Sequence, residues 1–360
     1  MLDTDKFIKD LISYGYTHLC TVPCSFAKNL INASINYSDQ LEYLPCASEA
    51  VACSVAAGLK LSGKKPIVIV QSSGLTNMGS CITSLLKPYK IFFPIIVSWR
   101  TYGEGDSEIQ HQHLAANLPN LIEAYGYKPV TLNKDEVGKA IMQIEHCDHQ
   151  NTICLLEAET FSPVSLSPDN QLDLSDYPKR SEYLKVLDSV FNDTNELFIG
   201  TTGNTAREMY HFMPRTSNFY MAGNMGGALS VGFGAAKAGK KVTVCGGDAE
   251  FVMHLGGLTT AGRYNNINLT YIVFDNKSNK STGGQNSYQK HVDYLNLARA
   301  CGVNSTFDIN SVSEFEVCIE KIKELNEVSV TRVSCSYDPM SPRPDKEVIQ
   351  GSKKIFLSSV

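Results

Sequence analysis

The sequence lacks the features that mark several large classes of protein. Its most apolar runs, 66–70, 91–97 and 269–274, are far too short to cross a bilayer and suit buried strands instead. The eleven cysteines are scattered, with no CxxC pair and no His/Cys cluster at zinc spacing, so we expect buried thiols in a reducing cytoplasm. The net charge is −5 and no long basic run is present, which argues against a nucleic-acid binder. The acidic N-terminal segment has no apolar core run, so we expect neither a secretory signal nor a transit peptide.

The chain does have the alternating pattern of a parallel α/β protein. With 360 residues, 43% of them hydrophobic and 19% charged, it is long enough for two domains of ordinary globular composition. Short apolar runs alternate with helical patterns in both halves. The predicted strands cover 18–22, 66–71, 91–99, 196–200, 241–245, 269–274 and 328–337. The predicted helices cover 25–34, 49–63, 77–86, 205–212, 227–238 and 251–264.

A weakly patterned segment separates the two halves. Residues 160–180 are rich in Ser, Pro and Asp, which is typical of a linker. We therefore expect two doubly wound parallel-sheet domains, 1–160 and 191–360, joined by a linker over 161–190. Their similar lengths suggest related folds.

Oxygen-bearing side chains follow two consecutive predicted strands of the second half. Asp248 ends the segment Gly246-Gly247-Asp248, and Asn276 follows the next strand. Ligands bind at the carboxyl edge of a parallel sheet, and Mg²⁺ takes a few protein oxygens together with phosphate. The neighbouring glycines and helix start leave backbone N–H groups for a phosphate. A Gly-Gly-Asp turn can also be a simple N-cap, but the pairing with Asn276 favours a metal site.

This stretch resembles the signature of thiamine-diphosphate (ThDP) dependent enzymes, a Gly-Asp-Gly followed by an Asn somewhat under thirty residues later. The resemblance implies that Asp248, Asn276 and the carbonyl of Ser278 hold Mg²⁺. It also implies a pyrimidine-binding first domain and a diphosphate-binding second domain, without the middle domain of larger decarboxylases. Ala249 stands where the family usually has Gly, so the turn must accept a Cβ, and we expect weaker or shifted diphosphate contact.

The first half offers a matching carboxylate. Glu49 opens an Ala-rich helix, where a Glu often only compensates the helix dipole at the surface. Its apolar neighbours make burial plausible. In ThDP enzymes a Glu in this place hydrogen-bonds the aminopyrimidine ring and activates the cofactor, so the resemblance makes Glu49 catalytic.

Further segments fit a cofactor site. Residues 201–208 follow a strand and open a helix, as a diphosphate cradle does. Met225 lies between Gly223 and Gly226, where the family has the large apolar residue that holds the cofactor in a V shape; without that context it would be an ordinary core Met. The cofactor contacts implied in this way are Glu49, Ser73, Thr202, Gly203, Gly223, Met225, Gly247, Asp248, Ala249, Glu250, Asn276 and Ser278.

Within this superfamily the chain is most similar to the phosphonopyruvate decarboxylases, with the sulfopyruvate decarboxylases as close relatives. The similarity covers about residues 15–115 and 196–290, in segments 22–25, 71–77, 98–100, 108–111 and 281–285. It implies decarboxylation of a small 2-oxo acid, and the substrate contacts it implies are Cys24, Ser25, Arg100, His111, Asn279, Lys280 and Gln285. Arg100, Lys277 and Lys280 suit a phosphonate or sulfonate. His111 is a candidate proton relay or acid-group ligand. The lysines could equally belong to a solvated loop, and His111 could be a hydrogen-bonded loop histidine.

Two departures keep other functions open. The phosphonate enzymes usually have Asp at Cys24 and His at Asn279, so the substrate or the protonation step could differ. The alternatives are another 2-oxo acid decarboxylase, a carboligase that passes the bound carbanion to an aldehyde, and a ThDP-binding protein without catalysis. The family places the cofactor between two subunits, which implies at least a homodimer. No G-x-G-x-x-G follows the first strand of either half, so a dinucleotide-binding domain is a weaker alternative.

Overall fold

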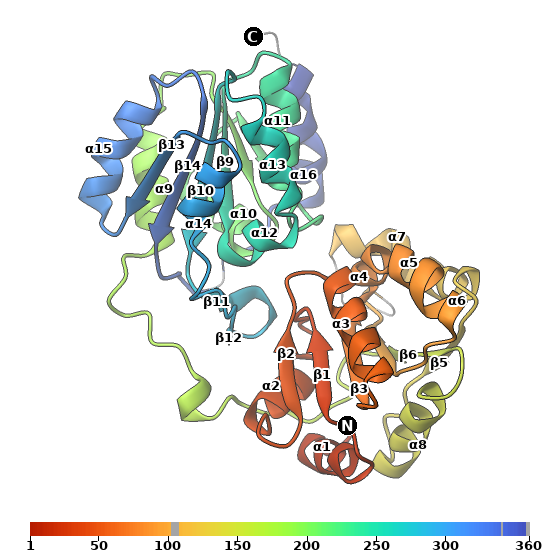
Figure 1. The fold of residues 1–360 in the computed structure, drawn as a ribbon. Coiled ribbons are helices and arrows are strands. Elements are labelled where there is room, and N and C mark those ends of the chain that lie inside the picture. The colour runs from red at the N-terminus through yellow and green to blue at the C-terminus, as the bar shows by residue number, and fades with distance from the viewer. Residues whose placement is uncertain (102–107, 340, 358–360) are drawn as a thin grey trace. The chain divides into compact units, whose positions relative to one another are not determined.

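The computed structural model describes residues 1–101, 108–339 and 341–357 (Figure 1). They form two compact units, one of Met1–Leu172 with Thr282–Asn286, the other of Asp173–Ser281 with Ser287–Val360. Each unit is an α/β sheet flanked by helices, and the described residues contain no third, middle domain. No helix in these residues is long and apolar enough to cross a membrane.

The first unit is built on a six-stranded sheet in which every neighbouring pair is parallel. Its strands are β1 His18–Thr21, β2 Glu42–Pro45, β3 Pro66–Gln71, β4 Ile95–Ser98, β5 Lys128–Thr131 and β6 Thr152–Leu156, in the order β2-β1-β3-β4-β6-β5. Successive residues of β3 are buried on opposite faces. Ile67 and Ile69 join one apolar cluster, and Val68 and Val70 join another. Burial on both faces explains why these strands are short continuous apolar runs.

The second unit repeats this plan. Its strands are β7 Leu197–Gly200, β8 Asn218–Tyr220, β9 Val242–Gly247, β10 Leu269–Asp275, β13 Ser305–Ile309 and β14 Val328–Ser334, in the order β13-β14-β10-β9-β7-β8, all parallel. Read from the other edge, this is the strand order of the first unit. The two halves therefore share one topology, and each sheet has a switch point, between β1 and β3 in one and between β7 and β9 in the other.

Helices cover both faces of each sheet (Figure 1). In the first half they are α1 Thr4–Ser13, α2 Lys28–Asn36, α3 Glu49–Leu61, α4 Ser72–Asn77, α5 Gly79–Cys81, α6 Lys87–Tyr89, α7 Ile109–Ala124 and α8 Val137–Cys147, with a π-helical turn at Ile82–Leu86. In the second half they are α9 Arg180–Val190, α10 Asn204–Phe212, α11 Ala228–Lys237, α12 Asp248–Met253, α13 Gly256–Gly262, α14 Tyr294–Ala300, α15 Val312–Ile322 and α16 Lys346–Ser352. Two very short strands, β11 Ser278–Asn279 and β12 Gln285–Asn286, lie after β10.

Some predicted elements differ from the structure. The first helix after β3, predicted to begin at residue 77, begins at Ser72 as α4. The single helix predicted over 251–264 is two helices, α12 and α13, which are separated at His254 and Leu255. The break precedes the pair Gly256 and Gly257, which favours helix less than other residues do.

The predicted linker is shorter than 161–190. Residues 180–190 form α9, which belongs to the second unit. Arg180 begins this helix and is only 2% exposed, and its guanidinium forms a two-bond ion pair with Glu208 of α10, at 2.8 and 2.9 Å. A buried bidentate pair of this kind fixes α9 against α10.

Candidate active site

The carboxyl edge of the second sheet carries the oxygen-bearing residues that are predicted to be metal ligands. β9 ends at Gly247 and Asp248 begins α12, while β10 ends at Asp275 and Asn276 follows. Gly247 is in register with Phe274 across the two strands. Because the strands are parallel and adjacent, Asp248, Asp275 and Asn276 leave the sheet at the same edge, beside the switch point.

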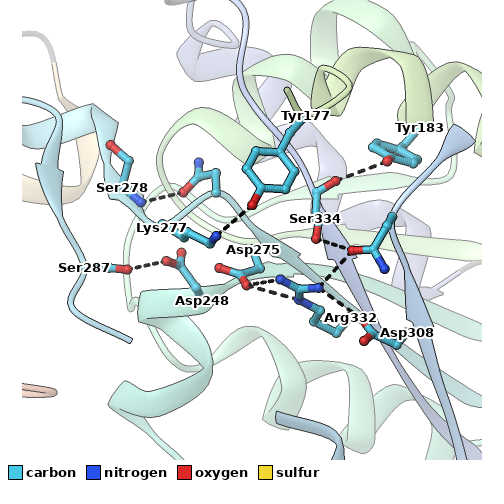
Figure 2. Close-up of polar contacts among 12 residues, drawn as sticks. Tyr177, Tyr183, Asp248, Asp275, Lys277, Ser278, Ser287, Asp308, Arg332 and Ser334 are labelled. Carbon is cyan, nitrogen blue, oxygen red and sulfur yellow. Dashed lines mark hydrogen bonds and ion pairs between the residues drawn. The ribbon is translucent and has the colours of Figure 1, made fainter. Parts of the chain in front are cut away.

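Asp248 is a buried carboxylate in an electrostatically unfavourable position. It is 4% exposed, and its Oδ2 accepts a hydrogen bond of 2.5 Å from the Ser287 hydroxyl (Figure 2). Burial, and then the nearby charge of Asp275, raise the pKa of Asp248 to about 6, although the Ser287 bond lowers it. A cation bound here would remove that penalty, which fits a divalent metal.

Asn276 and Ser278 form a tight turn beside this carboxylate. The Asn276 side-chain oxygen accepts from the Ser278 backbone N–H at 3.0 Å, and both residues are 6% exposed. Lys277 between them has a left-handed φ of 55°, and its ammonium group donates to the Tyr177 hydroxyl at 2.9 Å (Figure 2). The Ser278 hydroxyl is buried without a hydrogen-bond partner in the described chain. The turn thus concentrates neutral oxygens of the kind Mg²⁺ accepts.

A second charge pair lies behind these residues. Arg332 of β14 contacts Asp275 Oδ2 through its Nε at 3.1 Å and its Nη2 at 2.8 Å (Figure 2). Arg332 also donates to Asp308 of β13 at 3.1 Å. The charge of Asp275 is therefore compensated by Arg332. Of Asp248 and Asp275, Asp248 is the acid whose charge an added cation would compensate.

The loop after β7 has the properties of a phosphate site. Thr202 Oγ1 donates to the Ala222 carbonyl at 2.8 Å, and Gly203 has a φ of 88°. Asn204, the first residue of α10, is 7% exposed, yet neither atom of its side-chain amide has a hydrogen-bond partner in the residues described. Buried amides are normally satisfied, so an absent ligand is the simplest explanation. Thr202 and Gly203 were predicted from the sequence as cofactor contacts, whereas Asn204 was not, although a polar residue after Gly at a helix start is a signal for such a site.

The segment proposed to support the cofactor ring is a loop with unusual backbone angles. Asn224 and Gly226 have φ values of 57° and 87°, on either side of the half-buried Met225. Gly223 precedes them in the same loop. A side chain at Gly226 would also collide with His254, so this position requires glycine.

Ala249 and Glu250, which follow Asp248 in α12, were both predicted to contact the cofactor. Ala249 lies in the first turn of α12 and does not have a positive φ, so its Cβ is accepted without backbone strain. The Glu250 carboxylate accepts from Tyr271 Oη at 3.0 Å and from the backbone N–H groups of Gly247 and Ala228 at 3.3 Å each. Burial raises the pKa of Glu250 to about 7. Its side chain is thus occupied by protein donors, and any cofactor contact would come from its backbone.

In the first unit, Glu49 is placed as a buried side chain at the start of α3. It is 3% exposed, and its Oε2 accepts from Asn77 Nδ2 at 2.8 Å. Gly74 packs so closely against it that a Cβ there would lie 2.6 Å from Glu49 Oε1. The surface alternative for Glu49 is therefore wrong. Ser73 lies beside Gly74 in α4, where its carbonyl accepts from Thr76 Oγ1 at 2.6 Å.

A cationic cluster lies elsewhere in the same unit. Arg100 is 5% exposed, donates to the Ser25 hydroxyl at 2.9 Å, and contacts Glu108 Oε2 through Nη2 at 3.0 Å. His111, 3% exposed, contacts the same Glu108 oxygen through Nε2 at 3.1 Å. The structure therefore brings together three of the predicted substrate residues, Ser25, Arg100 and His111, around an acid that the sequence analysis did not single out.

The remaining predicted substrate residues have mixed surroundings. Cys24 is fully buried in an apolar cluster. Gln285 is also fully buried and donates to the Asn32 side-chain oxygen at 2.9 Å, within the first unit. Lys280 lies with its Nζ 4.8 Å from the centre of the Tyr337 ring, and Asn279 belongs to β11. Substrate contacts of these four residues remain predictions.

Comparisons with known proteins identify both halves. The thiamine pyrophosphate enzyme N-terminal TPP binding domain matches residues 4–115, and the thiamine pyrophosphate enzyme C-terminal TPP binding domain matches residues 199–333. Phosphonopyruvate decarboxylases of Streptomyces hygroscopicus and Streptomyces viridochromogenes are 30% and 29% identical, over 89% and 87% of this chain and 84% and 83% of theirs. Sulfopyruvate decarboxylase of Methanosarcina acetivorans is 27% identical over 94% of both chains.

Proposed function

The chain belongs to the family of thiamine-diphosphate-dependent decarboxylases, and on that premise we propose that it converts phosphonopyruvate to phosphonoacetaldehyde and CO₂. The reaction would draw forward the formation of phosphonopyruvate from phosphoenolpyruvate, which is unfavourable, and so would serve phosphonate biosynthesis. We also propose that the protein is cytoplasmic.

One observation carries the choice of substrate. Arg100 and His111 are buried together in the first unit, 5% and 3% exposed, on a common partner. The buried guanidinium of Arg100 is compensated by the Glu108 carboxylate, and its planar set of donors matches the oxygens of a phosphonate. Two relatives that cover most of the chain are named phosphonopyruvate decarboxylases, which supports the same acid group.

The bound cofactor supplies a positively charged ring that accepts the electrons released with CO₂. The chain's own contribution begins with Glu49. Its buried carboxylate, held by Asn77 and confined by Gly74, would exchange a proton with the cofactor's aminopyrimidine ring. The half-buried Met225 would exclude water from the reacting carbon, which favours loss of charge separation.

Diphosphate and Mg²⁺ fit the second unit. Asp248, the side-chain oxygen of Asn276 and the Ser278 carbonyl would hold Mg²⁺, and the residues present offer one uncompensated carboxylate and neutral oxygens for it. The N-terminus of α10 with Asn204 would bind the diphosphate, together with the backbone around Gly203 and Gly247.

The two halves of this machinery lie in different units, since Glu49 belongs to the first and Asp248 to the second. We propose a homodimer or larger assembly in which each active site combines the first unit of one subunit with the second unit of another. A membrane or nucleic-acid partner has no part in this proposal.

Alternatives within the family differ in substrate or in the last step. Sulfopyruvate is the main rival substrate, because a sulfopyruvate decarboxylase matches 94% of the chain at 27% identity. A carboligase would transfer the decarboxylated fragment to an aldehyde, and a binding-only protein would do neither.

Phosphorus NMR of the reaction mixture distinguishes these functions. With ThDP, Mg²⁺ and phosphonopyruvate, we expect phosphonoacetaldehyde as the only new phosphorus signal, also when an acceptor aldehyde is added. Glu49→Gln should lose at least about 10²-fold in kcat, as removal of a proton-transfer group does, and should still bind ThDP. Equal rates for Glu49→Gln and wild type would refute the catalytic role of Glu49, and a new ligation product would identify a carboligase.

A further inference from the structure

Three side-chain nitrogens lie within hydrogen-bond distance of a single oxygen of Glu108, and two of them belong to the predicted acid-group residues Arg100 and His111. Its Oε2 lies 3.0 Å from Arg100 Nη2, 3.1 Å from His111 Nε2 and 2.7 Å from Gln110 Nε2. The three side chains of Arg100, Glu108 and His111 are 6%, 11% and 4% exposed. A carboxylate can accept several hydrogen bonds, and charge-assisted bonds of this length are strong.

The Glu108 carboxylate changes the charge that the cluster presents to a substrate. The guanidinium of Arg100 and the carboxylate of Glu108 form a close ion pair, so the two charges offset each other. An anionic substrate that approaches Arg100 therefore also approaches a carboxylate. The two anions repel unless a proton lies between them, so the site discriminates against an acid group that cannot donate one.

Phosphonate and sulfonate differ in this property. A phosphoryl acid group loses its second proton near pH 6, so at neutral pH the dianion predominates and about a tenth of a phosphonate is the monoanion with one P–O–H group. That hydroxyl can donate a short O–H···O⁻ bond to a carboxylate. A sulfonate is fully ionised at the same pH and has no hydrogen to donate, so its oxygens would meet Glu108 without a proton between them.

His111 adds a second indication that this cluster receives a ligand. Its Nδ1 is buried and has no hydrogen-bond partner among the residues described, while its Nε2 faces Glu108. A buried ring nitrogen without a partner is unfavourable, and an oxygen of a bound phosphonate would accept a hydrogen bond from it when the imidazole carries both protons.

We propose that Glu108 is a specificity-determining residue that selects a phosphonate over a sulfonate by accepting its remaining proton. The proposal rests on the function proposed above and names the acid group of its substrate. A site built to hydrogen-bond a substrate hydroxyl rejects the analogue that lacks it by as much as about 10⁴-fold. Since Glu108 keeps its protein partners, we expect a smaller preference, of about 10²-fold in kcat/KM.

Glu108→Gln tests this selection directly. Gln has the same shape, no charge and an amide that can donate to a sulfonate. With the ThDP- and Mg²⁺-loaded enzyme, we expect the ratio of kcat/KM for phosphonopyruvate to that for sulfopyruvate to fall at least 10-fold. Pyruvate has neither a phosphonate nor a sulfonate on C3, so its kcat/KM should be nearly the same in Glu108→Gln and in wild type. Glu123→Gln, the same substitution at an exposed position of α7, is the matched control and should leave the ratio unchanged. A ratio in Glu108→Gln within threefold of wild type would overturn the proposal.

Binding of unreactive acids keeps the two proposals separable. We would titrate phosphonoacetate and sulfoacetate into the loaded wild-type enzyme by calorimetry. Tighter binding of phosphonoacetate by at least 10-fold supports the role of Glu108, even for an enzyme without turnover or when Glu108→Gln fails to fold. Equal binding of the two acids overturns it. Absence of turnover with every 2-oxo acid would instead refute the proposed decarboxylation.

Discussion

Asn77 donates a 2.8 Å hydrogen bond to the buried carboxylate of Glu49, which lies against the Cα of Gly74. The carboxylate is therefore held from two sides by the short helix α4 after β3. In a parallel sheet this is the switch-point edge, where ligands bind.

Gly74→Ala should displace Glu49. The new Cβ would lie 2.6 Å from Oε1, and Gly74 is itself buried, so the carboxylate has to move. We expect kcat to fall at least about 10-fold, with a loss of stability of about 1–3 kcal/mol for overpacking. Gly138→Ala, in an exposed part of α8 with nothing near the added Cβ, is the matched control and should keep full activity. Full activity of Gly74→Ala would contradict the placement of Glu49 at the reacting centre.

Asn204→Ala should weaken ThDP binding without destabilising the free protein. The amide has no hydrogen-bond partner within the described residues, so its removal breaks no internal bond there. A hydrogen bond to a charged group contributes about 1.5–3 kcal/mol, so Kd for ThDP should rise by at least about 10-fold. Asn204→Asp has the same shape and should bind still more weakly, because its charge repels the diphosphate. Calorimetric titration with ThDP gives both values, and unchanged affinity in Asn204→Asp would exclude Asn204 from the diphosphate site.

Asp248→Asn should stabilise the metal-free protein while it removes Mg²⁺-dependent cofactor binding. The pKa of Asp248 is raised in the folded state, from its ordinary value of 3.8 to about 6. The folded state therefore holds the proton more tightly, and stability falls as pH rises from about 4 to about 6 and stays lower above that. At about 1.4 kcal/mol per pKa unit, the variant should be more stable at pH 8 by up to about 3 kcal/mol, a gain that disappears near pH 4.

Denaturant unfolding without metal at several pH values measures this difference. Added Mg²⁺ and ThDP should raise the stability of wild type only. A variant that is less stable than wild type at pH 8 would contradict the uncompensated burial of Asp248.

Substitutions of Arg332 and Asp275, which form an ion pair, should have coupled effects on the free energy of unfolding (Figure 2). Arg332→Gln leaves the 6%-exposed Asp275 without its cation, and we expect a loss of about 2–4 kcal/mol, since removing one partner of a buried ion pair is strongly destabilising. Asp275→Asn in the same chain should restore part of that stability. A double-mutant cycle measures the coupling, which we expect to be at least about 1 kcal/mol. A coupling near zero would show that the pair does not protect the metal edge.

Seven of the twelve strands in the two six-stranded sheets were predicted, as short apolar runs, whereas β2, β5, β6, β8 and β13 were not predicted. β3 matches its predicted range, β10 ends one residue later than predicted, and β9 begins one residue later and ends two residues later. The relationship of Asp248 and Asn276 also followed from the sequence, since residues that end consecutive parallel strands meet at one edge. The helix α8 was also not predicted, although its buried residues Ala140, Ile141, Ile144 and Cys147 recur at helical spacing.

The partners of individual side chains could not be predicted in the same way. Arg100 and His111 were predicted as substrate residues, but their common contact with Glu108 depends on packing between a strand end and a helix start. Glu250 was predicted only as part of a motif, whereas in the structure its carboxylate accepts hydrogen bonds from Tyr271 and two backbone N–H groups. Such choices depend on three-dimensional contacts that no local spacing specifies.

The proposed decarboxylation is tested by CO₂ release from phosphonopyruvate, measured with and without ThDP and Mg²⁺ and beside sulfopyruvate and pyruvate. We expect fast release from phosphonopyruvate that requires ThDP and Mg²⁺, slower release from sulfopyruvate, and loss of activity in Glu49→Gln. No release from phosphonopyruvate by enzyme with bound ThDP would contradict it.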